Sequence, residues 1–268
     1  MKKKHGCWTD KKVICILIFL CLAINPLIGS VKTKMTVMTY NIRHAFGINE
    51  TLDLDEVFKV ISGENPDILI LNEIDQGNSR SGKVFQAEYL AEKLGMEYVF
   101  GHTEERDDYG NAILSKYSIV ESEAFDLPQP KWMKAVIRGC IRISVEINGN
   151  IIDIYGTHLG LGGFQEIQKE LGYIYEKYKE RKNPSIIAGD LNIEYLDLKS
   201  SIKGFFDDFR SANHYLGIDL HTFPSNFPGA QIDYILLSKG IEPVKVYTVD
   251  SFASDHLPIV CEIEVDNE

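Results

Sequence analysis

The sequence is poor in cysteine, which limits the kinds of site that it can build. Only Cys140 and Cys261, two of its five cysteines, lie beyond residue 30. Neither belongs to a pair with metal-ligand spacing, so a thiolate zinc site is excluded. Both sit in apolar, strand-like runs, and we expect buried free thiols. A disulfide between them is the alternative, because the sequence does not show whether the two residues meet.

The chain also lacks the excess of basic charge that duplex-binding proteins usually carry. Its net charge is −11. Without residues 1–30, Lys+Arg falls from 28 to 23 and Asp+Glu from 39 to 38, so the net charge becomes −15. This disfavours a duplex-binding surface, although a local basic loop is compatible with a negative total. The acidic excess suits a divalent-cation site and simple solubility equally well.

Long apolar runs are missing except near the N-terminus. Five lysines in MKKKHGCWTDKK precede VICILIFLCLAINPLIG, which carries no charge from Val13 to Gly29. A basic flank followed by an apolar run predicts an export signal in residues 1–30. An uncleaved membrane anchor is the alternative, because Leu27 and Ile28 make a poor cleavage site. In both cases the rest of the chain is predicted to be secreted or membrane-anchored and to face away from the cytoplasm.

No internal repeat, low-complexity tract or linker rich in Pro, Gly and Ser divides the chain. We therefore predict one domain over residues 34–268, which is long enough for a substantial core. Strand-like and helix-like patterns alternate in its first half, and hairpins follow. Many strands with few helices favour two sheets packed face to face with helices outside. Strands are predicted at 35–43, 66–74, 97–103, 110–120, 135–147, 150–159, 184–193, 231–239, 244–250 and 258–265, and helices at 52–64, 84–95 and 163–181.

Polar side chains collect at the ends of these apolar strands. Each one alone has a structural explanation, such as a solvated strand end, a turn or a satisfied core histidine. Their recurrence favours a site, because carboxylate and amide oxygens suit Mg²⁺ and two histidines can accept and donate protons near neutral pH. The residues at these ends are Asn41, Arg43, His44, Asn72, Glu73, Asp75, Thr157, His158, Asp190, Asn192, Asp233, Asp255 and His256.

Seven motifs in order resemble the endonuclease/exonuclease/phosphatase superfamily: TYNIRH, NEID, GNAILSKYSI, GTHL, GDLNI, IDYILLS and SDHLPIV. That superfamily includes DNase I, abasic-site endonucleases, inositol-polyphosphate phosphatases and neutral sphingomyelinases. The similarity covers nearly everything after residue 30, and GDxN with a terminal SDH is its most specific part. The resemblance implies an α/β fold, a four-layer sandwich of two packed mixed β-sheets flanked by helices. It also implies metal-dependent hydrolysis of a phosphoester by direct attack of water.

The resemblance implies a metal site and a water-activating group. Glu73 and Asn41 would bind Mg²⁺, with Mn²⁺ as an alternative ion, and Asp255 would complete the site. In some members an acid closely follows the first Asn, whereas this chain has Arg43 and His44. No metal ligand is therefore assigned there.

The catalytic residues that the resemblance implies come from four strand ends. His256 would accept a proton from the attacking water, and Asp233 would orient its imidazole. Asp190 and Asn192 would position the water and the phosphoryl group, and His158 would donate to a phosphoryl oxygen or the leaving group.

The residues that would contact the substrate are less specific. Asn111 resembles a residue that lines the family's site, and Arg43 and Arg80 could contact a phosphate or be solvated. Trp132, near lysines in a proline-bounded loop, would suit a lipid headgroup edge, and packing against its own domain is the alternative.

Three functions are compatible with the sequence. An exported phosphodiesterase for a lipid headgroup or small phosphoester is favoured by the export signal, the acidity and the Trp132 loop. A secreted endonuclease similar to DNase I fits export, but the charge of −15 argues against it. A non-catalytic binding module would lack a site residue, yet all are present. We expect a monomer, with membrane association through residues 1–30 if that segment is retained.

Overall fold

Strands from both halves of the chain form two mixed sheets in the computed structural model, which describes residues 32–103, 106–132, 136–181 and 183–266. The first sheet has the order β11 (Ile241–Thr248), β12 (Ile259–Asp266), β1 (Lys32–Asn41), β2 (Ile68–Asp75), β4 (Arg106–Ser115) and β3 (Glu97–Thr103). The second has the order β5 (Ile119–Asp126), β6 (Gly139–Ile147), β7 (Asn150–His158), β8 (Ser185–Asp190), β10 (Asp233–Ser238) and β9 (Phe209–Ser211).

Each sheet holds one parallel pair at its centre. β1 and β2 are parallel and are connected through α1 (Leu54–Glu64), and β7 and β8 are parallel and are connected through α3 (Phe164–Arg181). Parallel neighbours require such a crossover, whereas the remaining pairs are antiparallel. The four central strands therefore end in pairs, and their last residues carry the polar side chains that the motifs predicted.

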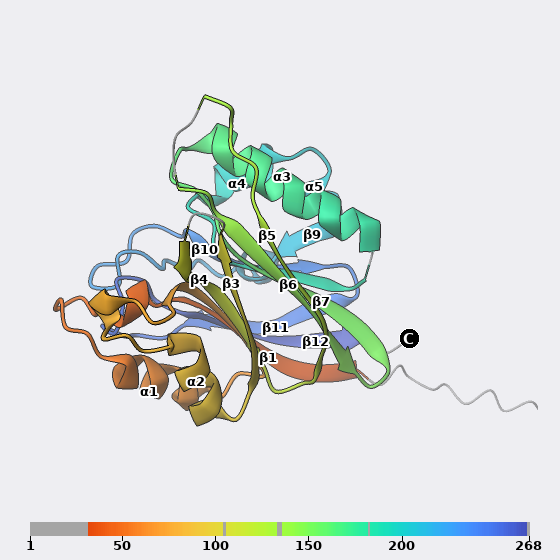
Figure 1. Ribbon diagram of the computed structural model, residues 1–268. Helices are drawn as coiled ribbons and strands as arrows, with labels where there is room; N and C mark the ends of the chain where they lie inside the picture. The colour runs from red at the N-terminus through yellow and green to blue at the C-terminus, as the bar shows by residue number, and fades with distance from the viewer. Residues whose placement is uncertain (1–31, 104–105, 133–135, 182, 267–268) are drawn as a thin grey trace, which may run out of the picture.

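Helices cover the outer faces of the two sheets (Figure 1). α1 and α2 (Gln86–Leu94) pack on the first sheet through an apolar cluster that includes Val57, Leu71 and Leu90. α3 packs on the second sheet together with α4 (Tyr195–Ser201) and α5 (Phe205–Asp208). Between the sheets lies a third cluster, rich in isoleucine and valine. The predicted four-layer α/β sandwich is confirmed.

Some predicted element boundaries were wrong. The run 110–120 is not one strand, because a turn separates β4 from β5. Ser115 Oγ donates to Tyr117 O at 2.7 Å and also accepts from Tyr117 N at 3.0 Å. The pattern also did not predict the short elements: the 3-10 helices Arg43–Ala45 and Ser79–Ser81, the helices α4, α5 and α6 (Ala212–Leu216), and the strand β9. These pieces are too short to show a period.

Cys140 and Cys261 are buried free thiols, as the first of the two alternatives predicted. The apolar N-terminal run lies outside the described residues, and its role as an export signal or anchor stays a prediction. Across the residues that are described, no helix is both long and apolar enough to cross a membrane.

Candidate active site

Glu73 reaches the site through an irregularity in β2. The pairing of β2 with β4 shifts register between Leu71 and Ile74, and Glu73 adopts a left-handed backbone with φ of 58°. Such a conformation is unfavourable for a residue with a Cβ and is concentrated at functional sites. In a regular strand, Asn72 and Glu73 would point to opposite faces. The bulge lets both side chains contribute to the same edge.

The Glu73 carboxylate is ionised and bonded to the first strand. Asn41 Nδ2 donates to Glu73 Oε1 at 3.2 Å, and His44 Nδ1 lies 3.6 Å from Oε2, which is long for a hydrogen bond. Burial acts to raise the pKa of Glu73, but His44 and the Asn41 amide outweigh it and lower the pKa to about 2. A negatively charged carboxylate is therefore available at neutral pH.

Asp190, at the end of β8, is the point on which the other side chains converge. Asn41 Nδ2 donates to its Oδ2 at 3.0 Å, and the Nε2 atoms of His158 and His256 lie 3.4 and 3.7 Å from the same oxygen. Its Oδ1 accepts from Asn192 N at 3.0 Å. Burial, with the nearby Asp233 carboxylate, raises the pKa of Asp190 above its usual range.

The glycine before Asp190 permits this convergence. Gly189 has φ of 139°, and a Cβ there would lie 1.8 Å from Thr157 O on the neighbouring strand β7. Only glycine lets the two strands approach in this way, and the register then pairs Asp190 with His158. The glycine of the GDLN motif thus has a steric role at the site.

His256 is held by an acid that is distant in sequence. Asp233, the first residue of β10, places its Oδ2 2.9 Å from His256 Nδ1, and the ring of Phe223 packs at 4.9 Å. Burial alone would lower the pKa of His256, but Asp233, Asp190 and Asp255 raise it to about 10. Because Nδ1 faces Asp233, Nε2 is the nitrogen that faces the centre of the site.

His158 differs from His256 in its charge state. It is buried, and burial together with Arg138 lowers its pKa to about 3, so the ring is neutral at physiological pH. Arg138 Nη1 lies 3.5 Å from its Nδ1. Since a guanidinium only donates, this contact favours the tautomer that carries its proton on Nε2, facing Asp190.

Asn72 joins the two sheets beneath these residues. Its Nδ2 donates to Asn111 Oδ1 and to Thr157 O, each at 2.9 Å, and its Oδ1 accepts from Asp190 N at 2.8 Å. Asn111 Nδ2 in turn donates to Gly139 O at 3.1 Å. These buried bonds fix the spacing between β2, β4, β7 and β8, so the site is built on a rigid base.

The donor set fits a hard divalent cation. Glu73 offers a charged carboxylate, and Asp190, Asp233 and His256 form a buried group whose ligand atoms lie within 4.8 Å of one another. Asp233 Oδ1 is buried without a hydrogen-bond partner among the described residues. Asn41 turns its amide nitrogen towards both carboxylates while its oxygen accepts from the backbone. It would bind a cation through Oδ1 only after the amide turns over.

The remaining predicted residues lie at the rim. Asp255 Oδ2 lies 3.6 Å from Arg43 Nε, and Arg43 also pairs with Glu50 at 2.9 Å. Arg80 makes a bidentate pair with the buried Asp75, at 2.7 and 2.8 Å. Within the described structure, no hydrogen bond joins the side chain of Asp255 to Glu73 or Asn41. All three rim residues thus have charged partners within the protein.

Two residues that the sequence reasoning assigned no role, His44 and Arg138, belong to the site. His44 follows the first strand, but its position beside Glu73 depends on a left-handed turn with φ of 44°. Arg138 precedes β6 in a stretch that reads as an ordinary strand. The sequence marked Arg138 only as a basic residue near Trp132, because its partner His158 is reached through sheet packing.

A buried pair of glutamates holds the loop that follows His158. Glu170 Oε2 accepts from Gly160 N at 2.7 Å, and Glu166 Oε2 accepts from Gly162 N at 2.6 Å. Both side chains come from the first turns of α3 and are fully buried. The Oε1 atom of each has no hydrogen-bond partner among the described residues. Burial, with the neighbouring Glu166, raises the pKa of Glu170 to about 8.

Replacing Glu170 with glutamine should flatten the dependence of stability on pH. The pKa of Glu170 rises from 4.5 to about 8 on folding, so the folded state holds an extra proton between these values. The free energy of unfolding of the wild type therefore falls as the pH rises through this window. Glutamine keeps the bond to Gly160 without an ionisable group. The free energy of unfolding of the variant, relative to that of the wild type, should therefore be about 1–3 kcal/mol higher at pH 9 than at pH 5.

Urea unfolding at pH 5, 7 and 9 measures this effect. Glu176→Gln, on the exposed side of the same helix, is the matched control and should follow the wild type. Parallel curves for the wild type and Glu170→Gln would show that Glu170 does not hold the extra proton.

Comparisons with known proteins show the family of the chain and support its fold. The sequence profile described as the Endonuclease/Exonuclease/phosphatase family matches residues 38–256. A family protein from Bacteroides thetaiotaomicron superposes with a TM-score of 0.74 at 20% identity, covering 88% of this chain and 100% of that chain. A mannosyl-6-phosphatase from the same organism gives 0.72 at 20% identity, covering 85% and 99%. D. rerio TDP2 with a single-strand DNA product gives 0.67 at 19% identity, covering 86% and 99%.

Proposed function

Because the chain belongs to the endonuclease/exonuclease/phosphatase family, we propose that it is a Mg²⁺-dependent phosphoesterase that acts outside the cytoplasm on the phosphorylated headgroup of an amphiphile. The family supports a phosphoester hydrolase. The converging side chains support a hydrolytic site, and the surface around that site supports the substrate class.

The proposed chemistry is an in-line attack of water on phosphorus. The water lies against Asp190 and Asn192 and passes a proton to His256, which Asp233 orients. As the new P–O bond forms, the bond to the alcohol breaks, and His158 Nε2–H donates to an oxygen of the reacting group. A divalent cation held by Glu73 and Asn41 would stabilise phosphoryl charge and, by opposing the carboxylates, lower the pKa of His256.

The observation that carries the substrate class is the position of the exposed apolar side chains. The five most exposed large ones all lie within six residues of a site residue along the chain. Leu161 follows His158, and Leu196 follows Asn192. Strongly exposed apolar side chains that follow or precede site residues in this way suit contact with lipid. Their exposed fractions are 84% for Phe227, 81% for Leu196, 77% for Leu161, 68% for Trp132 and 66% for Phe252.

A matched pair of substrates tests the proposal. With Mg²⁺, the protein should hydrolyse phosphatidylinositol or sphingomyelin in vesicles faster than plasmid DNA. The double variant Leu161→Ser/Phe227→Ser should lower turnover on vesicles about tenfold, because each lost apolar contact weakens membrane binding. It should leave hydrolysis of soluble bis(4-nitrophenyl) phosphate unchanged. Val120→Ser, an exposed valine on β5, is the control and should change neither activity.

Two results would contradict the lipid substrate. Efficient nicking of plasmid DNA without lipid turnover would favour nucleic acid, as for TDP2. Hydrolysis restricted to sugar phosphates would favour a small soluble phosphomonoester, as the name of the mannosyl-6-phosphatase indicates for that relative.

A further inference from the structure

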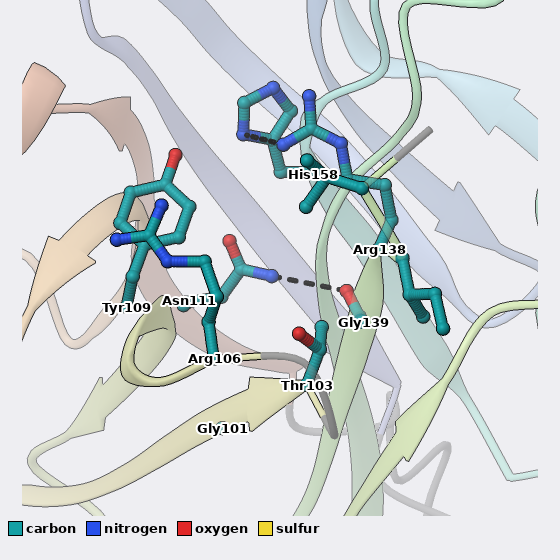
Figure 2. Close-up of a pocket in the computed structure, with 11 residues that line it drawn as sticks. Gly101, Thr103, Arg106, Tyr109, Asn111, Arg138, Gly139 and His158 are labelled. Carbon is teal, nitrogen blue, oxygen red and sulfur yellow. Dashed lines mark hydrogen bonds between the residues drawn. The ribbon is translucent and has the colours of Figure 1, made fainter. Parts of the chain in front are cut away.

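A pocket opens beside His158, next to the proposed catalytic site (Figure 2). Its cavity volume is small, about 20 Å³, so a ligand group would bind at its mouth. The pocket lies between the ends of β3 and β4 and the segment that enters β6. Asn111 and His158 line it and also belong to the site. Its other polar side chains are Thr103, Arg106, Tyr109 and Arg138. The pocket is reached from the Nδ1 side of His158, whereas Nε2 faces Asp190.

The two arginines of this pocket lack close carboxylate partners among the described residues. Arg138 is half-buried, and within the described part of the chain its guanidinium approaches His158 Nδ1 at 3.5 Å. No carboxylate pairs with its guanidinium among the described residues. Among the described residues Arg106 pairs with Asp108, at 3.4 Å, and the two side chains are 35% and 41% exposed. A partly desolvated guanidinium without a close counter-ion is unfavourable, and a bound anion would relieve it.

Arg80, a third arginine close to this pocket, does have a carboxylate partner. Both Arg80 and Arg106 lie over the ring of Tyr109, at 5.2 and 4.5 Å from its centroid. Arg80, however, is neutralised by the bidentate pair with Asp75. The charge that remains for a ligand is therefore that of Arg106 and Arg138.

Among its described residues, the pocket offers donors and no charged acceptor. Tyr109 is largely buried, and burial with the nearby Glu73 raises its pKa, so its phenol keeps the proton and can donate. None of the described residues that line the pocket is acidic. The catalytic site next to it has the opposite character, with Glu73, Asp190 and Asp233. The pocket and the catalytic site thus suit different parts of one ligand.

We infer that this pocket binds a second anionic group of the substrate, a phosphate or carboxylate separated by a short linker from the phosphoester at Asp190. The inference rests on the proposed phosphoesterase function and narrows its substrate to a headgroup with two anionic groups. Among vesicle lipids, a phosphorylated phosphatidylinositol should then be hydrolysed faster than phosphatidylinositol or sphingomyelin, each of which carries a single phosphate. Arg106, Arg138 and the Tyr109 hydroxyl hold the distal anion, and Asn111 and His158 form the wall that the linker crosses.

A series of alkane bisphosphonates with two to six methylene groups tests the pocket without turnover. Isothermal titration in Mg²⁺ compares each compound with the alkylphosphonate of equal length. At one linker length the bisphosphonate should bind at least about tenfold more tightly, as expected for one or two charge-assisted hydrogen bonds. Arg106→Gln and Arg138→Gln should each remove most of this gain.

Arg210→Gln is the matched control. Arg210 also lies over a tyrosine ring, that of Tyr215 at 4.6 Å. It is far from the pocket, because its neighbour in the sheet is Leu237, at the opposite end of β10 from Asp233. This variant should keep the full gain. Equal affinity of bisphosphonates and alkylphosphonates at every length would overturn the inference. So would an equal loss for both compounds in Arg138→Gln, because Arg138 would then serve the scissile phosphate.

The same preparations separate this inference from the proposed function. Hydrolysis of bis(4-nitrophenyl) phosphate reports on the phosphoesterase, whereas calorimetry reports on the pocket. A protein that binds the bisphosphonate selectively but hydrolyses no phosphoester would contradict only the proposed activity. A protein that hydrolyses the diester without any gain from the second phosphonate would contradict only the pocket.

Discussion

Replacing His256 with alanine is expected to lower kcat by a factor of about 10²–10⁴, the contribution typical of a positioned proton-transfer group. The imidazole is the group that links Asp233 to the centre of the site, through contacts of 2.9 Å to Asp233 and 3.7 Å to Asp190. Its removal leaves Asp190 and Asn192 in place. The loss should therefore fall on kcat rather than on substrate binding.

A double variant separates this role from a structural one. If Asp233 acts by orienting His256, then His256→Ala/Asp233→Asn should lose no more activity than His256→Ala alone, because residues that act as a unit are not additive. His214→Ala is the control, since His214 stacks on Tyr195 at 3.3 Å outside the site. Steady-state kinetics with Mg²⁺ and bis(4-nitrophenyl) phosphate measures all of them. Full activity in His256→Ala would contradict the proposed mechanism.

Glu73→Gln is expected to abolish activation by Mg²⁺ at millimolar concentrations. The substitution keeps the size of the side chain and an oxygen that can accept from Asn41 Nδ2, but it removes the negative charge that the low pKa of Glu73 maintains. Loss of a direct ligand should raise the Mg²⁺ concentration for half-maximal activity by at least about 100-fold, more than the loss of a supporting group.

A thermal readout makes this test independent of turnover. Mg²⁺ should raise the melting temperature of the wild type, because a cation that binds only the folded state stabilises it. It should leave that of Glu73→Gln unchanged. Glu88→Gln, on the exposed face of α2, should behave as the wild type. An unchanged Mg²⁺ dependence in Glu73→Gln would place the cation elsewhere, with the group of Asp190, Asp233 and His256 as the next candidate.

The prediction of the fold succeeded where apolar residues form a continuous run or repeat at helical spacing over many residues. β2 and β8 are almost wholly buried, so their continuous apolar runs read as strands covered on both faces. α3 repeats its apolar residues at helical spacing over 18 residues. The turn between β4 and β5 and the helices α4, α5 and α6 were missed, because local side-chain bonds and tertiary packing determine such short elements.

By itself, the sequence determined the layered α/β fold and the residue types at the strand ends, because the period of apolar side chains and the ordered motifs are properties of the chain alone. The tertiary structure decided which of these residues meet. Asp233 lies beside His256, whereas Asp255, next to His256 in sequence, turns towards Arg43. Glu73 depends on a bulge, and the pocket of Arg106 and Arg138 depends on packing between the two sheets. Such distances arise from strand register and sheet stacking, which no local pattern specifies.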